Sequence, residues 1–183
     1  MRWKPLILVL IIIIAGNFVW FHPQTVYRLF HPAGNQQVIQ YVFKNQQIFD
    51  TMASAQLVTA QRLHQRNDGN QELLSGYDQG TVVTLTADQA ENVKDLLQSP
   101  WSYAWDTVKS GMPDYGVLFR FQSAGGTVRV AFCFSCRQVG VFDGDDDSLK
   151  LVNSNSNFDP MRAQMVSLLK EIFPNDKEIQ ALQ

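Results

Sequence analysis

Residues 117–134 read Val-Leu-Phe-Arg-Phe-Gln-Ser-Ala-Gly-Gly-Thr-Val-Arg-Val-Ala-Phe-Cys-Phe, and this stretch decides the fold. On either side of residues 123–126, large apolar side chains recur at every second position, a period typical of a β-strand with one buried face. Gly125 and Gly126 favour a turn between the two halves. The stretch therefore predicts an antiparallel hairpin whose buried stripe comprises Val117, Phe119, Phe121, Val128, Val130, Phe132 and Phe134.

Further elements extend this hairpin in both directions along the chain. Strands are predicted at residues 55–63, 81–85, 139–142 and 148–152, and helices at residues 36–52, 87–98 and 160–173. Thr86 and Gln89 form a capping box before the second helix, whereas Asp159 is expected to cap the last one, with Pro160 at its first position. We expect an α+β fold in which an antiparallel meander buries one face against the helices.

The N-terminus carries an export signal that predicts a membrane helix before the domain. Arg2 and Lys4 precede an apolar stretch, residues 6–21, which would rise ~24 Å as a helix against a hydrocarbon core of ~30 Å. We expect an uncleaved single-pass anchor, with a cytoplasmic N-terminus and the domain outside the cell membrane. Cleavage as a signal peptide, which would secrete the domain, is the alternative.

The 183 residues suit one globular domain after this segment. Residues 1–21 are interpreted as the membrane anchor or signal peptide. Residues 22–35 are interpreted as a juxtamembrane linker, because His22-Pro23 and His31-Pro32 resist a long helix. Residues 36–183 then form a single extracytoplasmic α+β domain.

The charge pattern gives no sign of a polyanionic partner. The chain carries 15 basic and 17 acidic residues, and its charged fraction of 17% lies below the roughly 25% of typical soluble domains. Lys and Arg are scattered, without a basic helix or an Arg-aromatic stripe, so nucleic-acid binding is not expected. The expected partners are the membrane, through the N-terminal helix, and a protein of the cell envelope.

The two cysteines, Cys133 and Cys136, form a Cys-x-x-Cys motif. Thioredoxin-type chemistry needs the first cysteine at the N-terminus of a helix, but residues 137–142 predict a strand, which argues against that class. Zinc needs about four ligands in a structural site. None of the histidines at positions 22, 31 and 64 has ligand spacing with the pair, so we expect no metal site and no other cofactor.

Geometry restricts a bridge between Cys133 and Cys136. In an extended strand, residues three apart have Cα atoms ~10 Å apart, whereas a disulfide needs Cα atoms within about 7 Å. A bridge therefore requires a turn centred on Phe134 and Ser135. Since Phe-Ser does not favour a tight hairpin turn, two interpretations stay open: a structural or labile disulfide, and two partly buried free thiols.

Two other segments invite a functional interpretation. The acidic run at residues 143–147 resembles a calcium loop, but Ser154 stands where the closing glutamate is expected, so a solvated acidic hairpin is the better interpretation. Trp101, Tyr103 and Trp105 are either part of the core or the lining of a carbohydrate or peptide groove.

The middle and C-terminal thirds resemble a known group of proteins. The matching residues are Pro113-Asp-Tyr-Gly-Val117 and Val130-Ala-Phe-Cys-Phe-Ser-Cys136, with the junction at Leu85-Thr86 and the closing Phe173-Pro-Asn-Asp176. They are similar to a group of small bacterial proteins with a Cys-Phe-x-Cys signature. That resemblance implies an exported or anchored domain without an assigned activity. Some of those proteins carry a further cysteine before the proline, where this chain has Ser110-Gly111, which argues against a role that needs a third thiol.

No sequence motif identifies an enzyme. The chain contains no nucleophile elbow, phosphate loop, dinucleotide fingerprint or His-Glu zinc motif. We therefore name no catalytic residue and interpret the protein as a non-enzymatic, membrane-anchored domain with a binding or structural role. The alternative is a redox-responsive domain in which Cys133 and Cys136 alternate between dithiol and disulfide.

Overall fold

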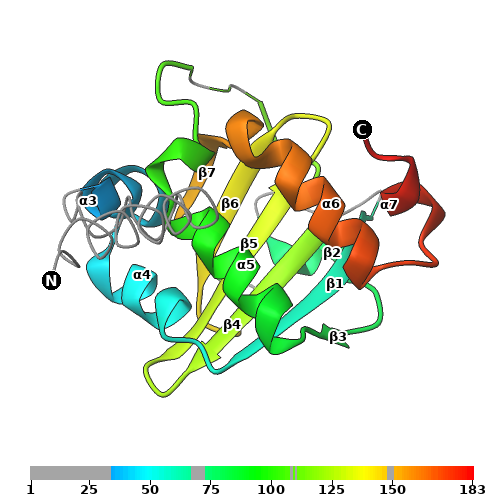
Figure 1. The fold of residues 1–183 in the computed structure, drawn as a ribbon, viewed down its shortest axis with the longest axis horizontal. Coiled ribbons are helices and arrows are strands. Elements are labelled where there is room, and N and C mark those ends of the chain that lie inside the picture. Colours follow the sequence, from blue (N-terminus) through cyan, green and yellow to red (C-terminus); the bar gives the residue numbers. More distant parts are fainter. Residues whose placement is uncertain (1–33, 67–72, 108, 110, 148–150) are drawn as a thin grey trace, which may run out of the picture. The chain divides into compact units, whose positions relative to one another are not determined.

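The computed structural model describes residues 34–66, 73–107, 109, 111–147 and 151–183. Residues 35–183 form one compact unit with an α+β fold (Figure 1). The expected membrane helix at residues 6–21 lies outside the described residues, as does almost all of the expected linker. Within the described ranges, no helix is long and apolar enough to cross a membrane.

The unit is built on a seven-stranded antiparallel sheet. The strand order is β2-β1-β4-β5-β6-β7, and β3 pairs with β1. The strands are β1 Leu57–Gln65, β2 Tyr77–Gln79, β3 Val83–Thr84, β4 Val117–Ser123, β5 Gly126–Cys133, β6 Gln138–Asp143 and β7 Asn153–Asn157. The predicted meander is confirmed for β4 to β7, which follow one another in both sequence and space.

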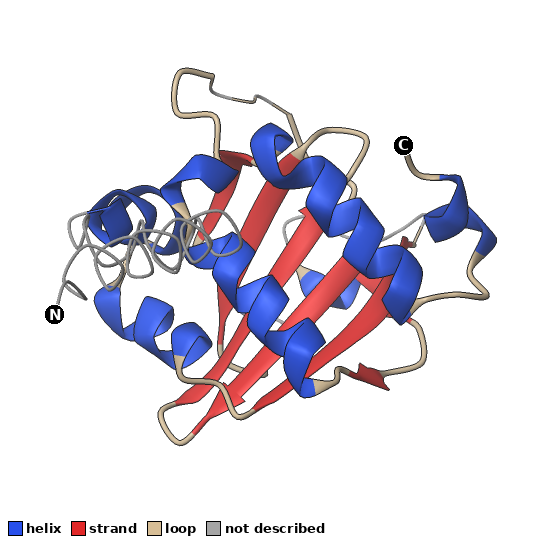
Figure 2. Cartoon of the chain, viewed as in Figure 1, coloured by secondary structure: helices blue, strands red, loops and turns tan. Residues whose placement is uncertain are grey.

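The helices are arranged against this sheet. They are α3 Gly34–Val38, the π-helical turn η1 Ile39–Phe43, α4 Gln46–Ala53, α5 Ala87–Gln98, α6 Arg162–Ile172, α7 Lys177–Ala181 and three short 3-10 turns, η2 Leu74–Gly76, η3 Pro100–Ser102 and η4 Asp159–Met161. Helices α4, α5 and α6 lie across the same face of the sheet (Figure 2). The predicted packing of helices on one face is therefore confirmed.

The main core fills the space between that face and the helices. The stripe predicted from the sequence is buried there, and its side chains contact apolar residues of the three helices. The Phe132 ring lies 5.8 Å from the ring of Phe119 and 5.1 Å from that of Phe158, in edge-to-face contacts. Each such side chain contributes about 1.5–3 kcal/mol through removal from water, so this layer is the main source of stability.

The second face of the sheet is also buried in part, which corrects the prediction of a single buried face. A smaller cluster covers it, comprising Leu63, Leu74, Tyr77, Tyr115, Leu118, Ala131, Cys133 and Phe142. Ala131 lies opposite Gly140 in the β5–β6 ladder. A Cβ atom at Gly140 would lie 2.2 Å from the Tyr115 hydroxyl oxygen, so the missing side chain makes room for the Tyr115 ring.

The single helix expected at residues 36–52 is wrong, because the chain turns in the middle. Lys44 has a left-handed backbone with φ of 61°, which ends η1. Asn45 then caps α4, and its side chain accepts a hydrogen bond of 2.7 Å from the Gln47 N–H. A local cap therefore overrides the apolar periodicity that continues through this segment.

The bounds of the other helices and strands agree with the predictions in some cases and differ in others. Helix α5 has the predicted bounds and the predicted capping box. The last helix begins later than predicted, because Asp159 forms a 3-10 turn and pairs with Arg137 rather than capping α6. Residues 148–150 of the strand expected at 148–152 lie outside the described residues, and the described strand that follows β6 is β7 at Asn153–Asn157. Strand β2 and helix α7 have no counterpart among the predicted elements.

We predict that Gly140→Ala destabilises the domain by about 1–3 kcal/mol, because the added methyl group overpacks the contact with Tyr115. Urea denaturation of both proteins measures the difference. Gly125→Ala is the matched control, since a Cβ there meets its nearest atoms at 3.4 Å or more. Equal destabilisation by the two substitutions would contradict the packing described for the second face.

Candidate functional site

Cys133 and Cys136 form a disulfide at the tip of the β5–β6 hairpin. Their Cα atoms lie 5.5 Å apart, because residues 134–137 make a turn between the paired residues Cys133 and Gln138. The turn at Phe134 and Ser135 that a bridge requires is therefore present. The alternative of two free thiols is not what the structure shows.

Arg137 explains how a Phe-Ser turn is possible. Its backbone is left-handed, with φ of 61°, so the turn is wider than a two-residue hairpin loop and Arg137 belongs to it rather than to the following strand. The Arg137 side chain pairs with Asp159, at 3.3 Å from Nε to the carboxylate. Position 137 holds neither glycine nor asparagine, so no local signal marked this conformation.

The two sulfur atoms have different surroundings. Cys133 is completely buried in the second-face cluster, whereas Cys136 is partly exposed. The Cys136 N–H donates a hydrogen bond of 3.1 Å to Cys133 Sγ, and the Ser135 hydroxyl lies 3.4 Å from the same sulfur. Two hydrogen-bond donors therefore lie against the buried sulfur, whereas the Cys136 sulfur lies 3.9 Å from the Cys133 carbonyl oxygen.

Acidic residues 143, 145 and 146 are exposed, as expected of a solvated acidic hairpin, and Asp145 and Asp147 also pair with arginines of the second face. Arg120 pairs with Asp145 at 2.8 Å, and the buried Arg129 pairs with Asp147. Thr127 adds a hydrogen bond of 3.0 Å to Asp145. These carboxylates neutralise two arginines that the strand alternation places on the sheet. No group of three or more candidate metal ligands occurs among the described residues.

The pKa of Asp145 reflects this environment. Partial burial raises the pKa, but hydrogen bonds from Arg120 and Thr127 and the charges of Arg120 and Arg129 outweigh it, so the pKa lies below its ordinary value. The ionised form is therefore favoured in the folded protein. Asp145 consequently contributes stability above its unfolded pKa of about 4, and that contribution is lost as the pH falls through the folded pKa.

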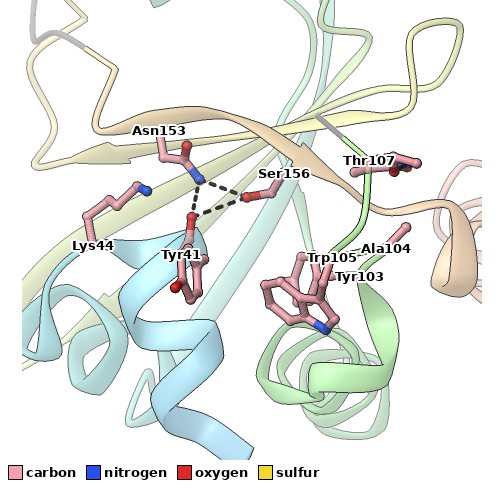
Figure 3. Close-up of a pocket in the computed structure, with 9 residues that line it drawn as sticks. Tyr41, Lys44, Tyr103, Ala104, Trp105, Thr107, Asn153 and Ser156 are labelled. Carbon is pink, nitrogen blue, oxygen red and sulfur yellow. Dashed lines mark hydrogen bonds between the residues drawn. The ribbon is translucent and has the colours of Figure 1, made fainter. Parts of the chain in front are cut away.

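A pocket of about 260 Å³ opens beside β7, the edge strand of the sheet (Figure 3). Three segments far apart in the sequence line it: Tyr41 and Lys44 at the end of η1, the connector after η3, and the edge strand β7. The lining residues are Tyr41, Lys44, Tyr103, Ala104, Trp105, Thr107, Asn153, Ser156 and Asn157.

Aromatic rings form one side of this pocket. The Trp105 ring lies 6.2 Å from the Tyr41 ring and 5.3 Å from the Tyr103 ring, measured between centroids. Tyr41 is 51% exposed and Trp105 36% exposed, whereas Tyr103 is buried and donates a hydrogen bond of 2.9 Å to the Leu97 carbonyl. The indole N–H of Trp105 is held by the Pro100 carbonyl at 2.9 Å, which fixes the orientation of the ring.

Polar groups from β7 form the opposite side (Figure 3). The Asn153 amide donates to the backbone carbonyls of Tyr41 and Val42, at 2.9 Å each, and to the Ser156 hydroxyl at 2.8 Å. The Asn157 amide donates to the Thr107 hydroxyl at 2.7 Å. These bonds tie η1, the connector and the edge strand together, so the pocket is preformed.

Of the three aromatic residues that the sequence analysis considered for a groove, two line the pocket and one does not. Tyr103 and Trp105 line the pocket, whereas Trp101 is 68% exposed and is not among the lining residues. Sequence reasoning missed Tyr41 and Lys44, since they lie about 60 residues before the connector and only the fold brings them there. The asparagine-serine run at residues 153–157 was the one available signal for the β7 side.

Comparison with protein-family models, with curated proteins and with solved structures finds no match. The resemblance to the Cys-Phe-x-Cys group stays a prediction. A function for this chain is therefore inferred from the geometry of the pocket and of the disulfide.

We predict that Asp145→Asn reduces the loss of stability that occurs as the pH falls below the unfolded aspartate pKa of about 4, because the depressed pKa of Asp145 then no longer contributes. The effect is below about 1 kcal/mol, since the carboxylate is half exposed and the pair is screened by water. Urea denaturation at several pH values measures it. Arg120→Ala should flatten the same part of the profile, and a profile unchanged in both variants would contradict the proposed pairing.

Proposed function

We propose that the protein is a membrane-anchored, extracytoplasmic binding domain that takes a saccharide unit of the cell envelope in the aromatic pocket. The observation that carries this proposal is the pairing of exposed aromatic faces with amide and hydroxyl groups in one preformed hollow. Anchoring and export rest on the N-terminal sequence alone: a short cationic head followed by the apolar residues 6–21.

The chemistry of the lining suits a sugar ring. Tyr41 and Trp105 leave apolar ring surface in water, and covering such surface contributes about 25 cal/mol per Å². The C–H face of a sugar is flat and apolar, whereas its edge carries hydroxyl groups that hydrogen-bond to side chains such as Asn153, Ser156 and Thr107. The pocket is smaller than the roughly 300–1,000 Å³ of sites for drug-sized ligands, which favours a single ring over a long chain.

The charge of Lys44 indicates which kind of sugar the pocket favours. Lys44 is the one charged side chain among the nine described lining residues, and its ammonium lies 5.8 Å from the centre of the Tyr41 ring. A cation beside an aromatic face favours a sugar that carries a carboxylate, because the anion can pair with Lys44 while the ring stacks.

The lining also argues for binding rather than hydrolysis. Glycosidases use a pair of carboxyl groups that flank the scissile bond. None of the nine described lining residues is aspartate or glutamate. The proposed role is therefore non-enzymatic, and the domain holds an envelope glycan near the membrane.

We predict that Trp105→Ala weakens binding of a short acidic oligosaccharide, with a carboxylate on its terminal sugar, by about tenfold, since one stacked aromatic contributes about 0.5–1.5 kcal/mol beyond its buried area. Isothermal titration calorimetry on the full-length chain in detergent measures the affinity. Trp101→Ala is the matched control, because Trp101 is exposed and does not line the pocket.

A second variant separates charge from stacking. Lys44→Gln should weaken binding of the acidic oligosaccharide and leave binding of its neutral analogue unchanged. No binding of either sugar by the unmodified chain, or equal losses in Trp105→Ala and Trp101→Ala, would refute the saccharide proposal. Binding of an unrelated acidic peptide in place of the sugars would assign the pocket to a protein partner instead.

A further inference from the structure

We propose that the Cys133–Cys136 bridge is a site of thiol–disulfide exchange, at which a small-molecule thiol attacks Cys136 and Cys133 leaves as a thiolate held by the turn. This inference is independent of the aromatic pocket. It depends on three features of the hairpin tip. The two sulfur atoms differ in exposure, hydrogen-bond donors lie against the buried sulfur, and the loop that the bridge closes is too short to stabilise the fold strongly.

Access selects the sulfur that is attacked. A thiolate must approach one sulfur in line with the S–S bond, so an enclosed sulfur cannot be the target. Cys133 has no exposed surface and contacts the second-face cluster, whereas Cys136 is partly exposed in the turn beside the exposed Ser135 and Arg137. Attack is therefore directed to Cys136.

The turn stabilises the leaving group. When Cys133 takes the electron pair of the S–S bond, its sulfur already accepts the Cys136 N–H at 3.1 Å and has the Ser135 hydroxyl at 3.4 Å. Hydrogen bonds to a charged acceptor are stronger than those to a neutral one, so both contacts gain strength as the thiolate forms. A better-stabilised leaving thiolate speeds the exchange.

Gln138, on the facing strand, carries a further donor that the Cys133 thiolate could use. It is 1% exposed and lies directly opposite Cys133 in the β5–β6 ladder. Its side-chain Nε2 is buried without a hydrogen-bond partner among the described residues. A buried amide group without a partner costs stability, and residues opposite each other in a ladder have side chains in reach. The Cys133 thiolate would supply the missing acceptor.

The short loop argues against a purely structural bridge. The bridge joins residues three apart in sequence, and a disulfide that closes a short loop restricts the unfolded chain less than one that closes a long loop. The backbone ladder between β5 and β6 already fixes the hairpin up to the pair Cys133–Gln138. The bridge therefore adds little to the stability of the fold, and its position favours exchange.

The exchange is balanced in atoms and electrons. The external thiolate forms a bond to Cys136 Sγ, the S–S bond breaks, and Cys133 Sγ leaves with the electron pair. The products are a mixed disulfide on Cys136 and a thiolate at Cys133. A second external thiolate then attacks the sulfur of the first, which releases an oxidised thiol pair and leaves Cys136 reduced; the protein gains two electrons and the external thiols lose two.

Glutathione tests which sulfur is attacked. The oxidised full-length chain in detergent is mixed with glutathione, quenched with acid, alkylated and mapped by peptide mass spectrometry. We expect the glutathione adduct on Cys136 to exceed that on Cys133 by at least ~10-fold, because Cys133 is enclosed. Adducts shared equally, or found mainly on Cys133, would overturn the assignment.

Two variants test the donors. Ser135→Ala and Gln138→Leu should each slow reduction of the bridge by ~3–10-fold and raise the pKa of the Cys133 thiol, followed by thiolate absorbance. Ser123→Ala, at the end of β4, is the serine control and should leave both quantities unchanged. Ser135 is exposed, so its variant folds even if Gln138→Leu does not. Reduction that proceeds only as fast as the chain unfolds would show a purely structural bridge and refute the proposal.

Discussion

Strand β5 is buried on both faces, and most of the structure depends on this constraint. From Thr127 to Cys133 every residue of the strand is buried. The helices cover one face through Val128, Val130 and Phe132. The other face carries Arg129, Ala131 and Cys133, and each of these side chains needs a different neighbour to be buried. Arg129 requires carboxylates, Ala131 leaves a gap that a ring must fill, and Cys133 requires an apolar surrounding.

Different segments of the chain supply these neighbours on the second face. The acidic loop after β6 supplies carboxylates to Arg129 and its neighbour Arg120. Tyr115 fills the space above Gly140, the residue opposite Ala131. Leu63, Tyr77 and Phe142 belong to the same buried cluster as Cys133.

Sequence patterns predicted the first face well and the second face poorly. The period of two placed β4, β5 and β6, and the Thr86–Gln89 capping box placed α5, because both signals are local. The left-handed residues Lys44 and Arg137 carry no local signal, so apolar periodicity predicts one helix across a break and a strand that includes part of a turn. The aromatic connector is visible in the sequence, but its partners Tyr41 and β7 meet it only after folding.

The same distinction applies to the cysteines. The spacing of the cysteines showed that a bridge requires a turn at Phe134 and Ser135, and it left free thiols as an alternative. It could not predict that Cys133 is buried on the second face, because that burial depends on segments distant in sequence. Alkylation of the chain, isolated without reductant and then denatured, tests the bridge most directly. We expect neither cysteine to be alkylated until a reductant is added. Alkylation of both cysteines before reduction would contradict the disulfide on which the exchange site depends.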